Sequence, residues 1–150
     1  MILDIVTGKD NSILRVKAEP VEVVDQAIKD LIANMKETLA STENGVGLAA
    51  PQVGKNLRLF VIGEDMSQDG HTVFINPIIT RIARKKVTTQ EGCLSLPGQW
   101  HELARPEKVT IKAQDENGQR FKLRAKGISA RLMLHETDHL EGGLFIDHIR

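Results

Sequence analysis

The chain has 150 residues, 41% of them hydrophobic and 27% charged, which suits one domain with a buried core and excludes intrinsic disorder. Twenty basic residues balance twenty acidic residues, so the chain as a whole does not attract nucleic acid or an anionic membrane. Aromatic residues make up only 3%, too few for a platform that stacks single-stranded nucleic acid. The basic segment RIARKK, residues 81–86, is interpreted as a solvated strand edge. We therefore expect no direct nucleic-acid binding.

The cysteine content and the N-terminal segment bear on the compartment. One cysteine is present, so no internal disulfide can form, which fits a reducing compartment. The first residues, MILDIVTGKDNSILR, lack the basic start and the long apolar run of a signal peptide. No apolar stretch approaches the roughly 18 residues that a membrane-spanning helix needs. These features predict a cytoplasmic protein that does not cross a membrane.

The first predicted element is an amphipathic helix from about Asp25 to Ser41. Its apolar residues recur at spacings of three and four, which place them on one helix face; they are Ile28, Leu31, Ile32, Met35 and Leu39. Asn44-Gly45 is expected to end the helix, because glycine is common at that position. The segment GVGLAAPQVG, residues 45–54, contains three glycines and a proline and predicts an irregular stretch of chain.

Strands are predicted in the middle of the chain. LRLFVI predicts a buried strand over residues 57–62, and two further strands, 72–75 and 78–88, are expected on either side of Asn76-Pro77. EGCLSLPG, residues 91–98, is predicted to form a short extended piece closed by Pro-Gly. These connections are short, which favours antiparallel pairing.

The last third predicts a hairpin followed by a second helix. Residues 109–113 and 120–125 alternate between apolar and polar side chains around the turn DENG, the pattern of a β-hairpin. Residues 127–141 predict the helix, and Gly142-Gly143 are expected to end it. Helix, antiparallel strands and helix in this order indicate a single α+β domain over residues 1–150.

The most informative motif is HETDH, residues 135–139. Residues four apart lie on one face of a helix, so His135 and His139 can bind one metal ion while Glu136 acts as a general base beside it. The alternative is a solvated helix turn whose acidic side chains face water. The apolar residues 132–134 argue against this alternative, because two buried histidines without a partner are costly. The motif therefore predicts a metal centre.

A catalytic metal centre of this kind needs a third protein ligand and one open position. Cys93 is the candidate, since its segment EGCLS has no obvious packing role. The alternative for a lone cysteine is a small buried hydrophobe. His148 follows a Gly-Gly break and is interpreted as a surface histidine, and His71 and His101 fall in polar loops where histidines are usually solvated.

Three segments, GVGLAAPQ (45–52), EGCLS (91–95) and HETDH (135–139), resemble in sequence and in order the signature segments of the peptide deformylase family. The resemblance covers nearly the whole chain. It implies an α+β fold with antiparallel strands packed around a central active-site helix and with an N-terminal helix. It also implies an enzyme that removes the formyl group from the N-terminal formyl-methionine of newly made polypeptides. Two positions depart from the family pattern, Leu134 where Gln is usual and Thr137 where an apolar residue is usual.

The resemblance implies a role for each matched residue. A metal-bound water or hydroxide would attack the formyl carbon with Glu136 as the general acid and base. Gln52 and the backbone N–H of Leu94 would stabilise the oxyanion, although a loop amide such as Gln52 often only caps nearby backbone. Gly47 would offer backbone hydrogen bonds to the peptide. The implied metal ligands are Cys93, His135 and His139.

A pocket for the methionine side chain is predicted from Val46, Ile128 and Leu132, which suit a hydrophobic core equally well. Around the metal, Glu91 is expected to brace the Cys93 segment. Two further interpretations concern buried polar contacts. Arg105 is expected to pair with a carboxylate, either Asp138 or Glu91, and the ligating histidines are expected to donate their second N–H to Asp138 or a backbone carbonyl.

A thiolate with two imidazoles suits zinc, iron(II), nickel or cobalt. Ligand type alone favours zinc, whereas the resemblance implies iron(II), replaceable by zinc, nickel or cobalt. The expected partners are N-formyl-methionyl nascent polypeptides, met near the ribosome by a monomer. Two other functions remain open at this point: a different HExxH-type metal hydrolase, such as a peptidase, and a non-catalytic deformylase-like module.

Overall fold

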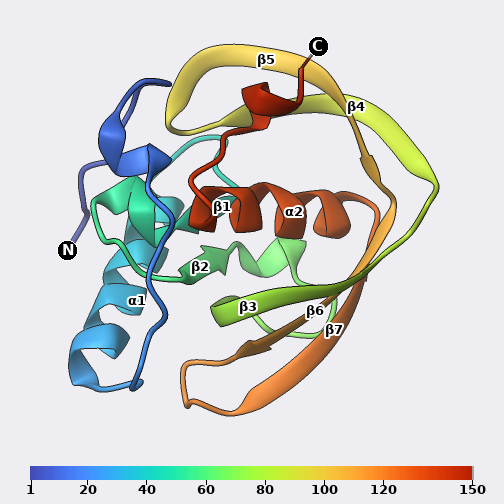
Figure 1. Cartoon of the computed structure of the whole chain (residues 1–150). Coiled ribbons are helices and arrows are strands. Elements are labelled where there is room, and N and C mark those ends of the chain that lie inside the picture. The colour runs from blue at the N-terminus through green and yellow to red at the C-terminus, as the bar shows by residue number, and fades with distance from the viewer. Residues whose placement is uncertain (150) are drawn as a thin grey trace.

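The computed structural model describes residues 1–149 and contains two α-helices and seven β-strands in that range (Figure 1). The helices are α1 (Gln26–Ala40) and α2 (Ile128–Leu140). The strands are β1 (Gly47–Ala49), β2 (Leu59–Ile62), β3 (Val73–Ile82), β4 (Lys86–Cys93), β5 (Leu96–Pro106), β6 (Lys108–Gln114) and β7 (Arg120–Lys126). Short 3-10 helices cover Ser12–Arg15, Ala50–Val53, Glu64–Met66 and Phe145–His148. None of the helices in this range is long and apolar enough to cross a membrane.

The strands form two antiparallel sheets on either side of α2. One sheet has five strands in the order β1-β2-β3-β6-β7, and the other is the two-stranded ribbon β4-β5. In Figure 1, α2 lies in the middle of the molecule, with the β4-β5 ribbon arching over it and the larger sheet beneath it. This arrangement confirms the predicted α+β class with antiparallel strands around a central helix.

Two hydrophobic clusters hold the helices to opposite faces of the large sheet. Phe60, Phe74 and Met133 belong to the cluster between the sheet and α2. Met35, Leu48 and Val61 belong to the cluster between the sheet and α1. Neighbouring strand residues enter different clusters because side chains alternate across a sheet. The helix that carries HETDH is therefore fixed against a packed β-sheet.

The first helix forms where its apolar spacing predicts, from Gln26 to Ala40 within the predicted bounds Asp25 and Ser41, but a different residue caps its C-terminus. Asp25 caps its N-terminus by accepting a hydrogen bond from the Ile28 N–H at 3.0 Å. The C-cap is Ser41, so the prediction that Asn44-Gly45 end the helix is wrong. Gly45 instead serves close packing, because a Cβ at that position would overlap the Thr42 hydroxyl.

Three strand boundaries differ from the prediction. Residues 45–54 are not irregular throughout, since they contain β1 and a 3-10 helix. Asn76-Pro77 does not separate two strands, because Asn76 takes a positive φ of 52° within β3 and its side chain binds the backbone of Val21. Asparagine tolerates this conformation better than most residues. The expected strand 78–88 is divided between β3, which ends at Ile82, and β4, which begins at Lys86.

The segment expected as a short extended piece is part of a long hairpin. β4 and β5 pair from Lys86↔Pro106 to Cys93↔Leu96, so Pro97-Gly98 lie inside β5 instead of closing the segment. Most side chains of this ribbon are exposed on both faces, which removes the alternation that reveals a half-buried strand. The ribbon carries Cys93 at its turn and holds that residue against α2.

Candidate active site

Side chains from the β4-β5 turn and from α2 converge on one point. One ligand atom each from Cys93, His135 and His139 lies within 4.8 Å of the other two. The Cys93 Sγ is 3.3 Å from His139 Nε2, and ligand atoms in a tetrahedral site with bonds of about 2.0–2.3 Å lie roughly 3.5 Å apart. One turn of α2 separates the two histidines and puts them on the same face. The three side chains fit a divalent metal ion and leave a fourth position for a small molecule.

Glu91 determines which nitrogen of His135 faces this point. Its carboxylate is 2.7 Å from His135 Nδ1 and also accepts hydrogen bonds from Arg105 and Arg131. Burial raises the pKa of Glu91, but the hydrogen bonds from His135 and Arg105 outweigh it and hold this pKa well below its usual range. An ionised carboxylate only accepts, so Nδ1 donates a proton to Glu91 and Nε2 is the nitrogen that faces the metal position.

Arg105 joins the two carboxylates that the sequence offered as alternatives. It donates to Glu91 from Nε at 2.9 Å and to Asp138 from Nη1 at 2.9 Å. Asp138 also contacts His148 at 2.9 Å, and this exposed histidine is not part of the metal centre. The predicted acceptor for the ligating histidines was Asp138 or a backbone carbonyl, and for His135 this prediction is wrong. Glu91 takes that role because β4 brings it directly against α2.

Two buried polar atoms beside the ligands lack a partner among residues 1–149. They are Glu136 Oε2 and His139 Nδ1. Glu136 is only 2% exposed, and burial raises its pKa to about 7. A buried carboxylate without a donor is costly, so its oxygen suits a water molecule or substrate next to the metal position. A carboxyl group with a pKa near neutral both accepts and returns a proton readily.

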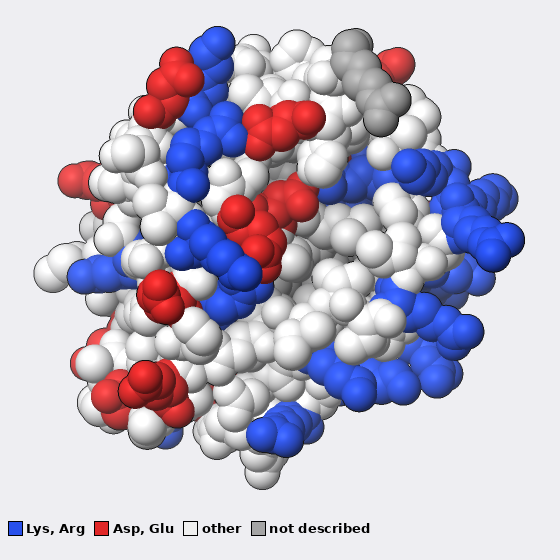
Figure 2. All heavy atoms as spheres, viewed as in Figure 1, with Lys and Arg blue, Asp and Glu red and all other residues white. Residues whose placement is uncertain are grey.

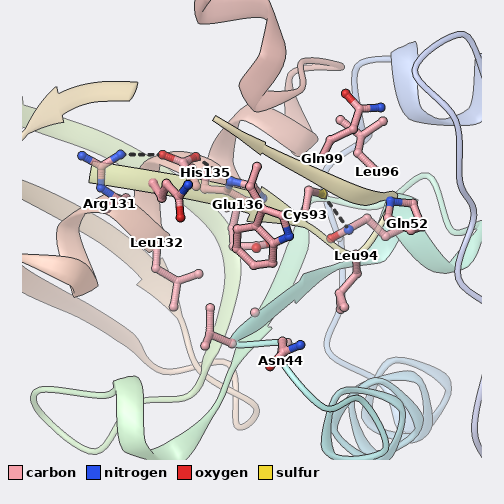
Figure 3. Close-up of a pocket in the computed structure, with 18 of the residues that line it drawn as sticks. Asn44, Gln52, Cys93, Leu94, Leu96, Gln99, Arg131, Leu132, His135 and Glu136 are labelled. Carbon is pink, nitrogen blue, oxygen red and sulfur yellow. Dashed lines mark hydrogen bonds and ion pairs between the residues drawn. The ribbon is translucent and has the colours of Figure 1, made fainter. Parts of the chain in front are cut away.

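Gln52 approaches the same point from the 3-10 helix after β1. Its Oε1 accepts from the Ala49 N–H at 2.9 Å, and its Nε2 donates to Ser95 Oγ at 3.1 Å and to Cys93 Sγ at 3.5 Å. Figure 3 shows this amide directed at the cysteine, with Leu94 alongside. Gln52 therefore does cap nearby backbone, as the alternative interpretation predicted, but only through its Oε1. The donor end of the amide remains beside the metal ligands.

A pocket of about 630 Å³ opens beside these residues (Figure 3). Its lining includes every predicted site residue except the deeply buried His139: Val46, Gly47, Gln52, Cys93, Leu94, Ile128, Leu132, His135 and Glu136. Val46 and Ile128 are exposed, at 39% and 65%, so they are rim residues and not core residues, whereas Leu132 is buried at 6%. The structure thus brings the three predicted apolar lining residues to one cavity.

Gly47 keeps the pocket open next to Glu136. A Cβ at this position would lie 2.9 Å from Glu136 Oε1 and 2.9 Å from Leu132 Cδ1, which is closer than unbonded atoms approach. Only glycine lets β1 pass so near the carboxylate. β1 is also the edge strand of the five-stranded sheet, so one side of its backbone has no strand partner in the described part of the chain.

Some lining residues were not predicted from the sequence. Trp100 from β5 is 55% exposed at the pocket, where it stacks over Gly92 so closely that a Cβ there would meet its ring at 2.6 Å. Arg131 lies one turn before His135 and donates to Glu91 at 2.7 Å and to the Val87 carbonyl at 2.6 Å. The i, i+4 spacing of Arg131 and His135 was the available signal that both reach the same neighbour.

Comparison with known proteins agrees with this geometry. The family model described as polypeptide deformylase matches residues 2–150. The chain belongs to the peptide deformylase family. Peptide deformylase 1 of Clostridium perfringens is 49% identical over 139 residues, which cover 93% of this chain and 92% of that protein. The peptide deformylase of Borreliella burgdorferi is 45% identical over 138 residues, which cover 92% of this chain and 82% of that protein.

Solved structures give the same result. The crystal structure of peptide deformylase from Thermotoga maritima matches with a TM-score of 0.91 and 37% identity, covering 100% of this chain and 99% of that one. A peptide deformylase from Legionella pneumophila matches with a TM-score of 0.93 and 39% identity, covering 100% and 87%. This deformylase is an enzyme that removes the formyl group from N-terminal methionine, and its Cys/His/His cluster is the metal site typical of the family.

Proposed function

We propose that this deformylase hydrolyses the formyl amide of N-formyl-methionyl polypeptides with Cys93, His135 and His139 as ligands of one divalent ion and Glu136 as the proton-transfer group. One observation supports this most: Glu136, whose buried Oε2 has no hydrogen-bond partner among residues 1–149, lies at a pocket that opens onto the converging ligand atoms. Hydrolysis of a formamide needs an activated water, stabilisation of negative charge and a proton for the leaving amine. The site has a group for each need.

The ion is proposed to be iron(II), which zinc, nickel or cobalt can replace. When bound, such an ion polarises a carbonyl oxygen and lowers the pKa of water at its open position. The thiolate of Cys93 neutralises part of its charge, and the imidazoles accept a first-row divalent ion of any of these kinds. The choice of iron rests on the family resemblance, since the donor set alone also suits zinc.

Glu136 is proposed to move the proton in both halves of the reaction. With a pKa raised to about 7 by burial, its carboxylate takes a proton from the attacking water and returns it to the departing nitrogen. Both steps fall within reach of one carboxyl group, because the pocket opens beside Glu136, where water and substrate would both bind. The products are formate and a free N-terminal methionine.

Gln52 and Leu94 are proposed to stabilise the oxyanion that forms on the formyl oxygen. Gln52 Oε1 is anchored on Ala49 and its Nε2 faces the ligands, so the amide is oriented before substrate arrives. The backbone N–H of Leu94 lies in the β4-β5 turn next to Cys93. Preorganised donors of this kind act where charge develops, and losing one typically costs about 3–4 kcal/mol of barrier.

The substrate peptide is proposed to add to the free edge of β1. An extended chain gains backbone hydrogen bonds there, and Gly47 lets it lie close to Glu136. The methionine side chain then enters the cavity bounded by Val46, Ile128 and Leu132. Binding energy from this side chain is needed, because the formyl group itself offers little surface.

The cellular setting follows from this substrate. We propose that residues 1–150 form a single catalytic domain that acts as a monomer in the cytoplasm on nascent polypeptides near the ribosome. The one cysteine would remain reduced there as a metal ligand. Sedimentation of the purified protein, which should match 16.6 kDa, tests the monomer.

The function is tested by measuring formate released from formyl-Met-Ala-Ser under anaerobic conditions with iron(II), then with nickel or zinc. We expect one formate per peptide and no product from the acetylated or unformylated peptide. The Cys93→Ser and Glu136→Ala proteins should lose at least about 10³-fold of the rate. Cleavage of an internal peptide bond without formate would favour the peptidase alternative, and full activity in either variant would overturn the assigned roles.

A further inference from the structure

Within residues 1–149, part of the five-stranded sheet has one face without a helix over it. α2 covers the face on which Ile111 and Leu123 are buried, and α1 packs on β1 and β2 at the other face. On β6 and β7 the alternate side chains therefore point to the α1 side, beyond the reach of α1. The exposed basic side chains among them, together with Arg81 of β3, form a surface that we call the basic face. Its residues are Arg81, Lys108, Lys112, Arg120, Lys122, Arg124 and Lys126.

The charges of the neutral chain are segregated toward this face. Residues 71–126 contain eleven Lys and Arg against five Asp and Glu. Figure 2 shows basic side chains gathered along the right and lower right rim, over the strands at that side of Figure 1, without acidic side chains among them. In the part of the chain that the structure describes, no ion pair involves any residue of the basic face.

The strand register brings like charges directly together. Lys108 pairs with Lys126 and Lys112 pairs with Lys122, while Thr110 pairs with Arg124. Like charges directly opposite one another destabilise an antiparallel pair, and an acidic residue on one strand would relieve the repulsion. An external polyanion that binds across both strands relieves it equally well. This arrangement therefore indicates a partner with many negative charges.

The basic face includes a concave end. A groove of about 580 Å³ is lined by Arg81, Lys108, Arg124 and Lys126 together with small and apolar residues of β3, β6 and β7. It shares no lining residue with the pocket at the metal ligands. A partner seated on the basic face would leave the active site open to a peptide.

We propose that the basic face docks this deformylase on double-stranded RNA through the phosphate backbone. The exposed side chains of β6 and β7 on this face are all polar, and β3 adds one exposed apolar residue, Ile78, opposite Lys112. The face thus has no aromatic ring to stack unpaired bases, and a single apolar side chain among cations is too little to insert into a lipid surface. Rows of cations suit the regular phosphates of a duplex, which proteins contact largely by shape and charge. No nucleic-acid binding was expected from the sequence because the net charge of the whole chain is zero. That total hides the local excess of positive charge on this face.

The choice of RNA over DNA rests on the proposed function, because newly made polypeptides emerge beside RNA. Simultaneous docking and catalysis are compatible with the fold, since α2 and the sheet separate the basic face from the pocket. The docking itself does not depend on catalysis, so the two proposals succeed or fail separately.

The test is fluorescence anisotropy of a labelled 20-base-pair RNA duplex titrated with the metal-loaded protein over a series of salt concentrations. We expect micromolar binding at low salt and a slope of log K against log[salt] of about −3 to −5, from several phosphate contacts. The Lys112→Glu/Lys122→Glu protein should bind at least about tenfold more weakly and lose about two units of that slope.

The matched control is Lys29→Glu/Lys36→Glu, which makes the same change in net charge on the exposed side of α1. It should bind RNA like the unmodified protein, and both double variants should keep full formate release, which shows that they fold. Equal weakening by both variants would mean a net-charge effect and overturn the proposal. So would the absence of duplex binding, a preference for the equivalent DNA duplex, or binding to phosphatidylglycerol vesicles but not to RNA.

Discussion

Replacing Glu91 by glutamine tests how the metal ligands are held in place. Glu91 is 6% exposed and accepts hydrogen bonds from Arg105, Arg131 and His135. Glutamine keeps the shape but removes the negative charge, which leaves two guanidinium groups without their shared partner. Removing one partner of a buried ion pair costs roughly 3–5 kcal/mol. Because the glutamine oxygen still accepts one hydrogen bond, we expect about 3 kcal/mol of lost unfolding free energy.

The same substitution should weaken metal binding. His135 no longer donates Nδ1–H to a carboxylate, and loss of such a partner typically lowers metal affinity by about 10–100-fold. Stability is measured by urea unfolding of the metal-free protein, and affinity by chelator competition with zinc. Glu102→Gln on β5 is the control, because Glu102 is exposed and forms no ion pair within residues 1–149. If the two variants have equal stability and equal zinc affinity, Glu91 does not organise the site.

The pH dependence of stability gives a further check on Glu91. Its folded-state pKa is lowered, so its contribution to stability is complete above the unfolded pKa of about 4.3 and is lost as the pH falls below it. The unmodified protein should therefore lose stability steeply in acid. The unfolding free energy of Glu91→Gln should fall less steeply as the pH decreases. If it falls as steeply as that of the unmodified protein, other groups cause the acid sensitivity.

Three further predictions concern catalysis and metal uptake. Gln52→Ala should lower kcat by about 10²–10³-fold with little change in KM, since the amide acts on the oxyanion, as steady-state formate release will show. Gly47→Ala places a methyl group 2.9 Å from Glu136 Oε1 and Leu132 Cδ1, and it should lower kcat/KM by about 10²-fold while the fold persists. The pKa of His135 in the metal-free protein is raised to about 10, because hydrogen bonds to Cys93 and Glu91 outweigh burial. Zinc must displace that proton, so its apparent Kd should fall at least tenfold per pH unit between about pH 6 and 9.

Each of these has an outcome that contradicts it. A Gln52→Ala enzyme with normal kcat and a raised KM would make the amide a substrate-binding group. A fully active Gly47→Ala enzyme would mean that β1 does not approach the carboxylate as closely as described. A zinc affinity independent of pH would show that His135 is already neutral before the metal binds.

Features with a local sequence signal were predicted well. The apolar spacing from Ile28 to Leu39 and the DENG turn each depend on neighbouring residues, and both elements formed as expected. β5 was missed because its exposed residues carry no alternation between apolar and polar. Asn76 was taken for a strand boundary, since its positive φ and its bonds to Val21 depend on a distant part of the chain.

In the candidate site, too, features with a local sequence signal were predicted and those that depend on distant residues were not. Two histidines four apart predict a shared ligand on a helix, whatever the rest of the fold. Nothing in the spacing of Cys93 and His135 shows that they meet, and the resemblance of whole segments supplied that link. The Glu91–Arg131 contact joins a strand to the helix over 40 residues of sequence, so only the packed structure reveals which carboxylate orients His135.

In the proposed mechanism, Glu136 transfers the proton beside an ion held by Cys93, His135 and His139. The most direct measurement is single-turnover formate release by the Glu136→Gln protein after its metal content has been determined. We predict one ion per chain, unaltered binding of formyl-Met-Ala-Ser and a rate at least about 10³-fold lower than that of the unmodified enzyme. Formate release at the normal rate by the fully loaded variant would contradict the account.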